Sequence, residues 1–252
     1  MLFENVEVGK TPNLEAFHFE VERYPDPLGL GDSVNKIGAD LNPASMLTEL
    51  LTEDDYGFNL QLSGVGAEVD TASFSAVGST LDAEANGMSL KWTNGQTLER
   101  IIETITKQTD SVLRFDPKTG LWGLKLVRDD YNPASLLILD ESNSNLISDT
   151  RANWNETINE VIVSYSDRDL IEDPPPAVAQ DISNFRRQGR HKAITLSFPG
   201  CYSSTLAQNL ASRELAASGF SLSAIELTVD RTAWALLPGD VFRSSWDRDW
   251  ET

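Results

Sequence analysis

Residues 42–52 read Asn42-Pro43-Ala44-Ser45-Met46-Leu47-Thr48-Glu49-Leu50-Leu51-Thr52, and Asp54-Asp55-Tyr56-Gly57 follows them. Asn42 can accept a hydrogen bond from the first helical turn, and Pro43 occupies a position where a missing N–H is not needed. The apolar residues repeat at helical spacing and share one face: Met46, Leu47, Leu50 and Leu51. The stretch therefore predicts an amphipathic helix with one buried face.

A second helix followed by a hairpin is predicted further along the chain. The apolar residues of this helix again follow the helical period: Leu98, Ile101, Ile102 and Ile105. Thr93 and Gln96 offer it a capping-box start. Two strand-like runs, 112–115 and 121–127, then flank Asp116-Pro117-Lys118-Thr119-Gly120, whose proline and glycine are typical of a turn.

The second half of the chain predicts strands and one more helix. Alternating apolar residues mark three strands, which we expect to form one twisted antiparallel sheet: Val161, Val163 and Tyr165; Ile194, Leu196 and Phe198; Ile225, Leu227 and Val229. A helix over 203–218, ended by Gly219, is expected to pack on this sheet. Its inward residues are Leu206, Ala207, Leu210 and Ala211.

Both ends of the chain predict strands without an obvious partner. The alternation from Phe17 to Tyr24 is typical of a half-buried strand, and the run 25–32 then reads as a loop. The run from Val241 to Trp246 predicts a closing strand. Because unpaired strand edges favour pairing with other segments, we expect both strands to need partners from elsewhere.

This order of elements, with the strand Asn159–Tyr165 and the late Leu237-Pro238-Gly239-Asp240-Val241, resembles the central hub region of phage tail-tip and baseplate-hub proteins. This is the family of the tail-tip attachment protein of lambda-like siphophages. The resemblance runs from about Asn42 to about Arg243, and none of its motifs is catalytic. The positions that match the family pattern are structural: Asn42, Pro43, Trp92, Trp154, Tyr165, Pro238, Gly239 and Asp240.

The resemblance implies an α+β fold, with mainly antiparallel β hub domains and a small helix-plus-hairpin subdomain. On this interpretation, residues 1–41 are the end of a preceding β-domain and a loop. Residues 42–140 form the helix and hairpin α/β subdomain. Residues 141–252 form an antiparallel β-domain with one helix at 203–218, which we expect to be truncated at its C-terminus.

The function that the resemblance implies is structural rather than enzymatic. The chain would be a homotrimer at the distal end of the phage tail, joining a ring of distal tail protein to the tip, the fibres or a receptor-binding protein. The tape-measure protein would end in its lumen, and DNA would pass through it in transit during ejection. Host attachment would depend on the tip that it carries.

The charge balance argues against a DNA-binding protein and is compatible with a conduit, although the solubility of the chain is the simpler explanation of its acidity. The 252 residues carry 20 Lys and Arg against 39 Asp and Glu, a net charge of −19. Such a chain repels a phosphate backbone, and a lumen without many cations lets DNA slide. One basic cluster stands apart and is either a solvated loop or a contact to a neighbouring subunit or to lumen DNA: Arg186, Arg187, Arg190, His191 and Lys192.

The sequence has few residues that could bind a transition metal or act as a catalytic nucleophile. Two histidines far apart, His18 and His191, and the single Cys201 do not make a zinc site, and one cysteine forms no internal disulfide. No cofactor is expected, because phosphate-loop and nucleophile-elbow motifs are missing from the sequence. The longest apolar runs, such as 136–139, are far too short to span a bilayer.

Two alternatives remain open from the sequence. A tail-associated hydrolase could cleave glycan or peptidoglycan with an acidic pair, and the candidate pairs are Asp54 with Asp55, Asp129 with Asp130, Asp167 with Asp169, and Asp247 with Asp249. A carbohydrate-binding module could use an aromatic platform. We expect four tryptophans to be core or subunit-interface anchors instead: Trp92, Trp122, Trp154 and Trp234.

Overall fold

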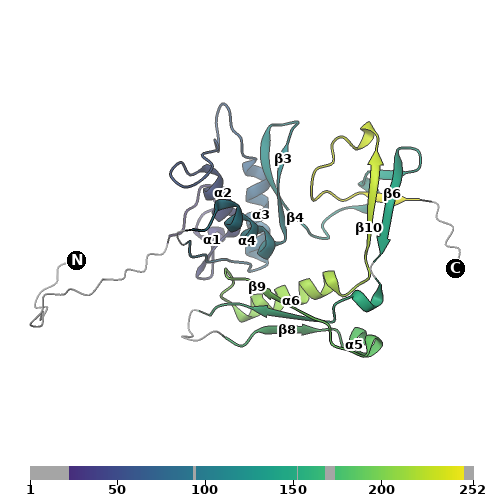
Figure 1. Ribbon diagram of the computed structural model, residues 1–252. Helices are drawn as coiled ribbons and strands as arrows, with labels where there is room; N and C mark the ends of the chain where they lie inside the picture. The colour runs from purple at the N-terminus through teal and green to yellow at the C-terminus, as the bar shows by residue number, and fades with distance from the viewer. Residues whose placement is uncertain (1–22, 93–94, 152, 168–173, 247–252) are drawn as a thin grey trace, which may run out of the picture.

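The computed structural model describes residues 23–92, 95–151, 153–167 and 174–246. The fold is α+β, as predicted, with helices and small, mostly antiparallel sheets (Figure 1). The described part holds two separate clusters of buried apolar side chains. Most of the predicted strand Phe17–Tyr24, the start of the capping box at Thr93, and three candidate residues lie outside the described residues: Asp169, Asp247 and Asp249.

The first core is built by helices and short strands from the first half of the chain (Figure 1). They are α1 (Asp32–Asn35), β1 (Lys36–Ile37), β2 (Asp40–Leu41), α2 (Pro43–Thr52), α3 (Thr71–Ala83) and α4 (Leu98–Thr109). The antiparallel hairpin of β3 (Ser111–Asp116) and β4 (Leu121–Leu126) closes it, as predicted. Phe74, Leu81 and Ile105 are fully buried at its centre.

Asn42 holds three helices of this core together. Its Oδ1 accepts from Ala44 N–H at 3.0 Å, which caps α2 as predicted. Its Nδ2 donates to the carbonyls of Val34 at 2.9 Å and Gly78 at 2.8 Å, in α1 and α3. A Cβ at position 78 would lie 3.5 Å from Nδ2 and 2.8 Å from Leu30 Cδ1, so a glycine there lets α3 approach closely. The predicted cap is therefore also a buried cross-link.

The structure differs from the sequence-based expectation at two helices. Helix α4 begins at Leu98, because Thr97 caps it by accepting from Arg100 N–H at 3.4 Å; the predicted start at Thr93 and Gln96 is wrong. Helix α3 was not predicted. Its buried residues do follow the helical period, but serines, threonines and a glycine surround them: Phe74, Val77, Gly78 and Leu81.

The second core is a three-stranded sheet covered by a helix. The strand order is β8 (Ala177–Gln180), β7 (Glu160–Ser164), β9 (Ala193–Ser197). The helix α5 (Ile182–Gln188) connects β8 to β9, and α6 (Ser204–Ser218) packs on the sheet (Figure 1). The prediction of α6 is confirmed with all four inward residues buried: Leu206, Ala207, Leu210 and Ala211.

The expectation of one antiparallel sheet in this half is wrong. Strand β9 runs parallel to β7, because α5 turns the chain after β8 and brings it to the opposite edge of β7. Strand β10 (Ser223–Val229) pairs instead with β6 (Ser144–Arg151), as a separate antiparallel ribbon. Three short 3₁₀ turns connect these parts: Pro133–Ser135, Trp154–Glu156 and Arg231–Ala233.

The closing strand has a partner within the chain, contrary to expectation. Strand β11 (Arg243–Ser245) pairs in parallel with β5 (Ile138–Asp140). The partner is distant in sequence, so local patterns could not reveal it. Among the described helices, none has the length and apolar character needed to cross a membrane.

Asn42 and Asn132 allow a matched test of the buried cap. Both begin an Asn-Pro-Ala-Ser tetrapeptide, and Asn132 caps the exposed turn Pro133–Ser135 by accepting from Ala134 N–H at 3.1 Å. We predict that Asn42→Ala lowers the free energy of unfolding by about 2–4 kcal/mol, since it removes a cap and two hydrogen bonds that link α2 to α1 and α3. Asn132→Ala should cost less than about 1 kcal/mol. Urea denaturation measures both, and equal losses would contradict the account.

Candidate functional site

A groove of about 450 Å³ lies where the two cores meet. Volumes of roughly 300–1,000 Å³ are typical of ligand pockets. Buried side chains form its apolar floor: Leu41, Leu50 and Ile101. Tyr56 and Trp92 form an aromatic wall, with ring centroids 5.6 Å apart at 88°. Pro199 and Tyr202, which lie between β9 and α6, form another side.

A polar triad stands at one end of this groove. Arg23 Nη2 lies 2.5 Å from Glu49 Oε1, and Arg23 Nη1 donates to the Tyr56 hydroxyl at 2.5 Å. The Tyr56 hydroxyl donates in turn to Glu49. Burial raises the pKa of Tyr56 to about 12, and the hydrogen bond to Glu49 acts in the same direction. Tyr56 is therefore a neutral donor that orders the groove, rather than a base.

The late Pro238-Gly239-Asp240 turn docks on strand β3 of the first core. Arg114 Nη1 lies 2.5 Å from Asp240 Oδ1, and Asp240 Oδ2 accepts from Leu237 N–H at 3.0 Å. Gly239 has φ of +85°, and a Cβ there would lie 3.3 Å from Val112 Cγ2. Three of the family-pattern positions thus meet in one contact that joins segments more than a hundred residues apart.

This contact shifts the ionisation of Asp240. Burial alone would raise the pKa of the carboxyl group, but the hydrogen bond from Leu237 N–H and the hydrogen bond and charge of Arg114 outweigh it. The pKa of Asp240 is therefore lowered, and the ionised form stabilises the fold.

The basic cluster lies on the second core, and four of its five residues are exposed: Arg186, Arg187, Arg190 and His191. Arg186 and Arg187 are in the last turn of α5, and the Arg187 guanidinium lies 4.9 Å from the Trp154 ring centroid. Arg190 Nη2 and Lys192 Nζ donate at 2.8 Å and 2.6 Å to carbonyls of the turn Trp154–Glu156. His191 stacks on Phe185, with ring centroids 4.2 Å apart. A role at a subunit interface or lumen stays a prediction.

The four tryptophans do not belong to the buried core. Trp92, Trp154 and Trp234 are exposed, the last to 66%, so the core interpretation of these three is wrong and the interface interpretation stays a prediction. Trp122 is half-buried and packs on Phe115 across the hairpin, with centroids 5.5 Å apart. Tyr165, another family-pattern position, packs against the second core.

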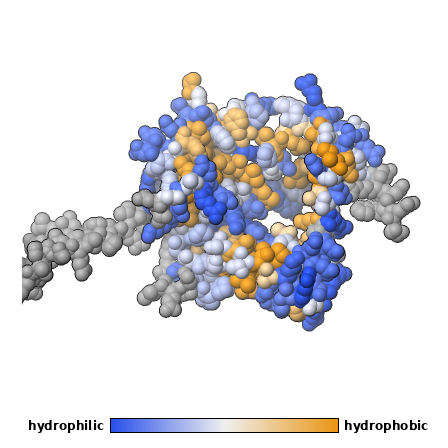
Figure 2. All heavy atoms as spheres, viewed as in Figure 1, coloured by the Kyte–Doolittle hydropathy of each residue, from blue (hydrophilic) through white to orange (hydrophobic). Residues whose placement is uncertain are grey.

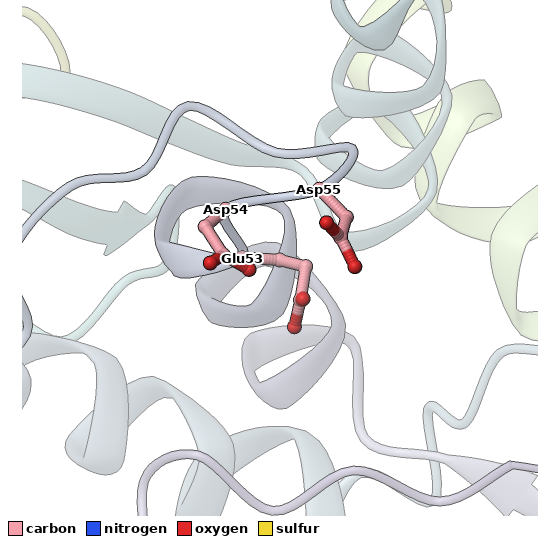
Figure 3. Close-up of side chains that lie close together, drawn as sticks. All are labelled: Glu53, Asp54 and Asp55. Carbon is pink, nitrogen blue, oxygen red and sulfur yellow. The ribbon is translucent and has the colours of Figure 1, made fainter.

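Asp54 and Asp55 are brought together with Glu53 at the end of α2 (Figure 3). Their carboxylate oxygens lie within 4.8 Å of one another. Both aspartates are exposed, so the three carboxylates form an acidic surface cluster rather than a pair facing across a cleft. Cys201 is fully buried, and burial raises the pKa of its thiol to about 11, which makes it a poor nucleophile.

The Arg114–Asp240 pair predicts a measurable pH dependence. Asp240→Asn should lower the free energy of unfolding at pH 7 by about 1–2 kcal/mol, because a charged hydrogen-bond partner is lost. Since the folded-state pKa is lowered, the wild-type advantage is complete above about pH 4 and is lost as pH falls further, through the folded-state pKa.

The exposed pair Arg100–Glu103 on α4 supplies the control, because its nitrogen and oxygen are 2.6 Å apart but both side chains are solvated. Glu103→Gln should change the free energy of unfolding by less than about 0.5 kcal/mol. Thermal and urea unfolding of both variants between pH 3 and pH 7 is the measurement. An Asp240→Asn effect that persists unchanged at the lowest pH would contradict the assignment.

Comparisons with known proteins identify the chain's family. A family model described as "Putative phage tail protein" matches residues 96–252, which include Trp154 and the Pro238–Asp240 turn but not Asn42 or Trp92. Curated proteins provide no match. The solved 43 kDa tail protein of prophage MuSo2 from Shewanella oneidensis is 16% identical, with a TM-score of 0.32, over 51% of this chain and 37% of that chain. Because the family match covers more than half of its length, this chain belongs to the family of phage tail proteins.

Proposed function

We propose that this chain is a hub of the phage tail tip or baseplate, present as a homotrimer at the distal end of the tail. It connects the ring of distal tail protein to the tip, fibres or receptor-binding protein, and the tape-measure protein ends in its lumen. Membership of the tail protein family supports a structural role in the virion tail. The family match does not give a position within the tail, and the position at the hub is our proposal.

The observation that carries the proposal is the ribbon of β6 and β10. Ile225, Leu227 and Val229 alternate along β10 and so share one face, and Leu146 of β6 lies opposite Leu227. Ile225, Val229 and Leu146 are each exposed to between 36% and 40%. A two-stranded ribbon is marginally stable by itself in water, so this apolar face favours coverage by another subunit.

The position of the ribbon also fits assembly around an axis. Figure 2 shows hydrophobic residues on the side of the molecule between the β3–β4 hairpin and the β6–β10 ribbon, where the surface is hollowed. If other copies of the chain cover this apolar face, the rest of the surface, which is acidic, faces the lumen and the solvent. With a net charge of −19, such a lumen would hold DNA only in transit.

A structural hub is preferred to the hydrolase and carbohydrate-binding alternatives. The acidic cluster at residues 53–55 is on the surface, and the aromatic wall of the groove holds Tyr56, which pairs with Arg23 and Glu49. The paired polar groups of this wall stabilise the chain itself, whereas a sugar platform needs polar groups that point to a ligand.

Two double variants of β10 test the assembly. Ile225→Glu with Val229→Glu places charges on the apolar face of the ribbon and should abolish incorporation into tails while leaving the helical circular dichroism unchanged. Ala224→Glu with Thr228→Glu alters exposed positions on the opposite face of the same strand and should assemble normally.

The copy number in purified tails, from quantitative mass spectrometry, and the symmetry in an electron cryomicroscopy map are the readouts. We expect three copies on the tail axis. Six copies, a peripheral position, or equal behaviour of the two double variants would overturn the hub proposal.

The proposal also predicts weak DNA binding. The net charge of −19 repels the phosphate backbone, and Arg187, Arg190 and Lys192 each already contact the turn Trp154–Glu156. Purified protein should not shift duplex DNA at physiological salt in a gel. Salt-sensitive binding that disappears in an Arg186→Ala, Arg187→Ala variant would show that the basic cluster contacts DNA.

A further inference from the structure

The groove between the two cores is basic at its rim, although the chain as a whole is acidic. Three of its lining side chains are cations, Arg23, Lys91 and Arg100, and one is an anion, Glu49. Arg23 lies 2.5 Å from Glu49, so these two charges balance. Lys91 and Arg100 are exposed, and the solvated pair of Arg100 with Glu103 costs little to open. In a chain with a net charge of −19, this rim favours an anionic occupant.

The floor and the aromatic wall of the groove favour an occupant that is also apolar. Buried aliphatic side chains form the floor, and the Trp92 ring beside it is 42% exposed. Exposed indole rings are frequent anchors for the apolar side chains of a partner. The volume of about 450 Å³ is in the range of sites for small ligands, so a few residues of a polypeptide fit it. The expected occupant is a short segment with carboxylates and bulky apolar side chains.

The segment that follows β4 has this composition and lies on the surface. It reads Val127-Arg128-Asp129-Asp130-Tyr131. Val127 and Tyr131 are exposed to 48% and 41%, and both aspartates are exposed. Arg128 is held by its own core, where its Nε and Nη2 contact Glu84 at 2.7 Å and 2.8 Å. The segment therefore presents two carboxylates and two apolar side chains, while its one cation is already paired.

The segment lies away from the groove of its own chain. Val127 N–H donates to the Asp110 carbonyl at 2.9 Å, and Arg128 Nη2 donates to the Thr109 carbonyl at 3.0 Å, which fixes the segment at the C-terminal end of α4. The groove lies toward the other end of this helix, where Arg100 belongs to its lining. Roughly 13 Å of helix separate Arg100 from Thr109, at about 1.5 Å per residue. The chain then leaves β4 toward the β6–β10 ribbon and away from α2 (Figure 1), so only another copy brings this segment to the groove.

We propose that residues 127–131 of one copy occupy the groove of a neighbouring copy. The two aspartates lie at the basic rim, and the Tyr131 ring covers Trp92 beside the apolar floor. Because two different surfaces meet, the contact is head-to-tail, and its repetition closes a ring when the rotation between copies permits. This contact deepens the hub proposal and rests on its assembly from several copies, but not on the position of these copies in the tail.

An exchange of charges between the two surfaces tests the proposal in the full chain. Lys91→Glu with Arg100→Glu should reduce incorporation into tails by roughly tenfold or more, and so should Asp129→Lys with Asp130→Lys, because like charges then face each other. The chain with all four substitutions should return to the wild-type level, because opposite charges face each other again. Two further substitutions would not repair a folding defect, so this recovery identifies a contact between copies.

Asp54→Lys with Asp55→Lys is the matched control. Asp54-Asp55-Tyr56 repeats the tripeptide of residues 129–131, and its aspartates are also exposed. Tyr56, however, is held within its own chain by Arg23 and Glu49. This variant makes the same change of charge and should enter tails at the wild-type level. Wild-type incorporation of either reversed pair, or no recovery in the chain with four substitutions, would overturn the proposed contact.

Cross-linking of purified tails separates this contact from the hub proposal. A carbodiimide joins a carboxylate to a lysine amine where the two are in contact, so mass spectrometry of covalent oligomers should find Lys91 linked to Asp129 or Asp130. Lys91→Arg keeps the charge and should remove the link. Three copies on the tail axis without this link would overturn the contact and leave the hub proposal intact. The link in a ring of another size, or at a peripheral position, would confirm the contact and overturn the hub proposal.

Discussion

The carbonyl end of helix α4 is the point on which the arrangement of the two cores depends. A helix leaves its last carbonyls without partners, and cations are favoured there. Arg213 of α6 donates to the carbonyls of Gln108 at 2.8 Å and Lys107 at 3.2 Å. Arg128 donates to Thr109 at 3.0 Å from within the first core, and its Nε lies 2.7 Å from Glu84. One helix end is therefore shared between both cores.

The neighbouring contacts follow from this shared end. Gly200 lies against Met88, and a Cβ there would come within 2.5 Å of Met88 Cγ, so the loop after β9 approaches the first core as closely as backbone allows. Ser89 N–H donates to the Gly200 carbonyl at 3.1 Å, and Lys107 Nζ lies 5.7 Å from the Phe198 ring centroid. The groove, whose walls come from both cores, exists only while these contacts hold.

Elements with a local signal were predictable, and those decided by distant contacts were not. Helix α2 was predictable because a cap, a proline and an apolar stripe coincide, whereas Gly78 and the surrounding serines obscured the stripe of α3. The pairing of β10 with β6 joins residues as far apart as Ser144 and Val229, and no pattern along the chain encodes it. The sequence predicted that Trp92 is a core or subunit-interface anchor, but no pattern in it indicated the contact of Trp92 with Tyr56.

Calorimetric unfolding of two arginine variants tests the shared helix end most directly. Arg213→Met removes the hydrogen bonds from α6 to the carbonyl end of α4, and Arg128→Met removes a cap that belongs to the first core alone. The account predicts one cooperative unfolding transition for the wild type. It predicts one transition at a lower temperature for Arg128→Met, and two separate transitions for Arg213→Met. A single transition for Arg213→Met at the wild-type temperature would contradict it.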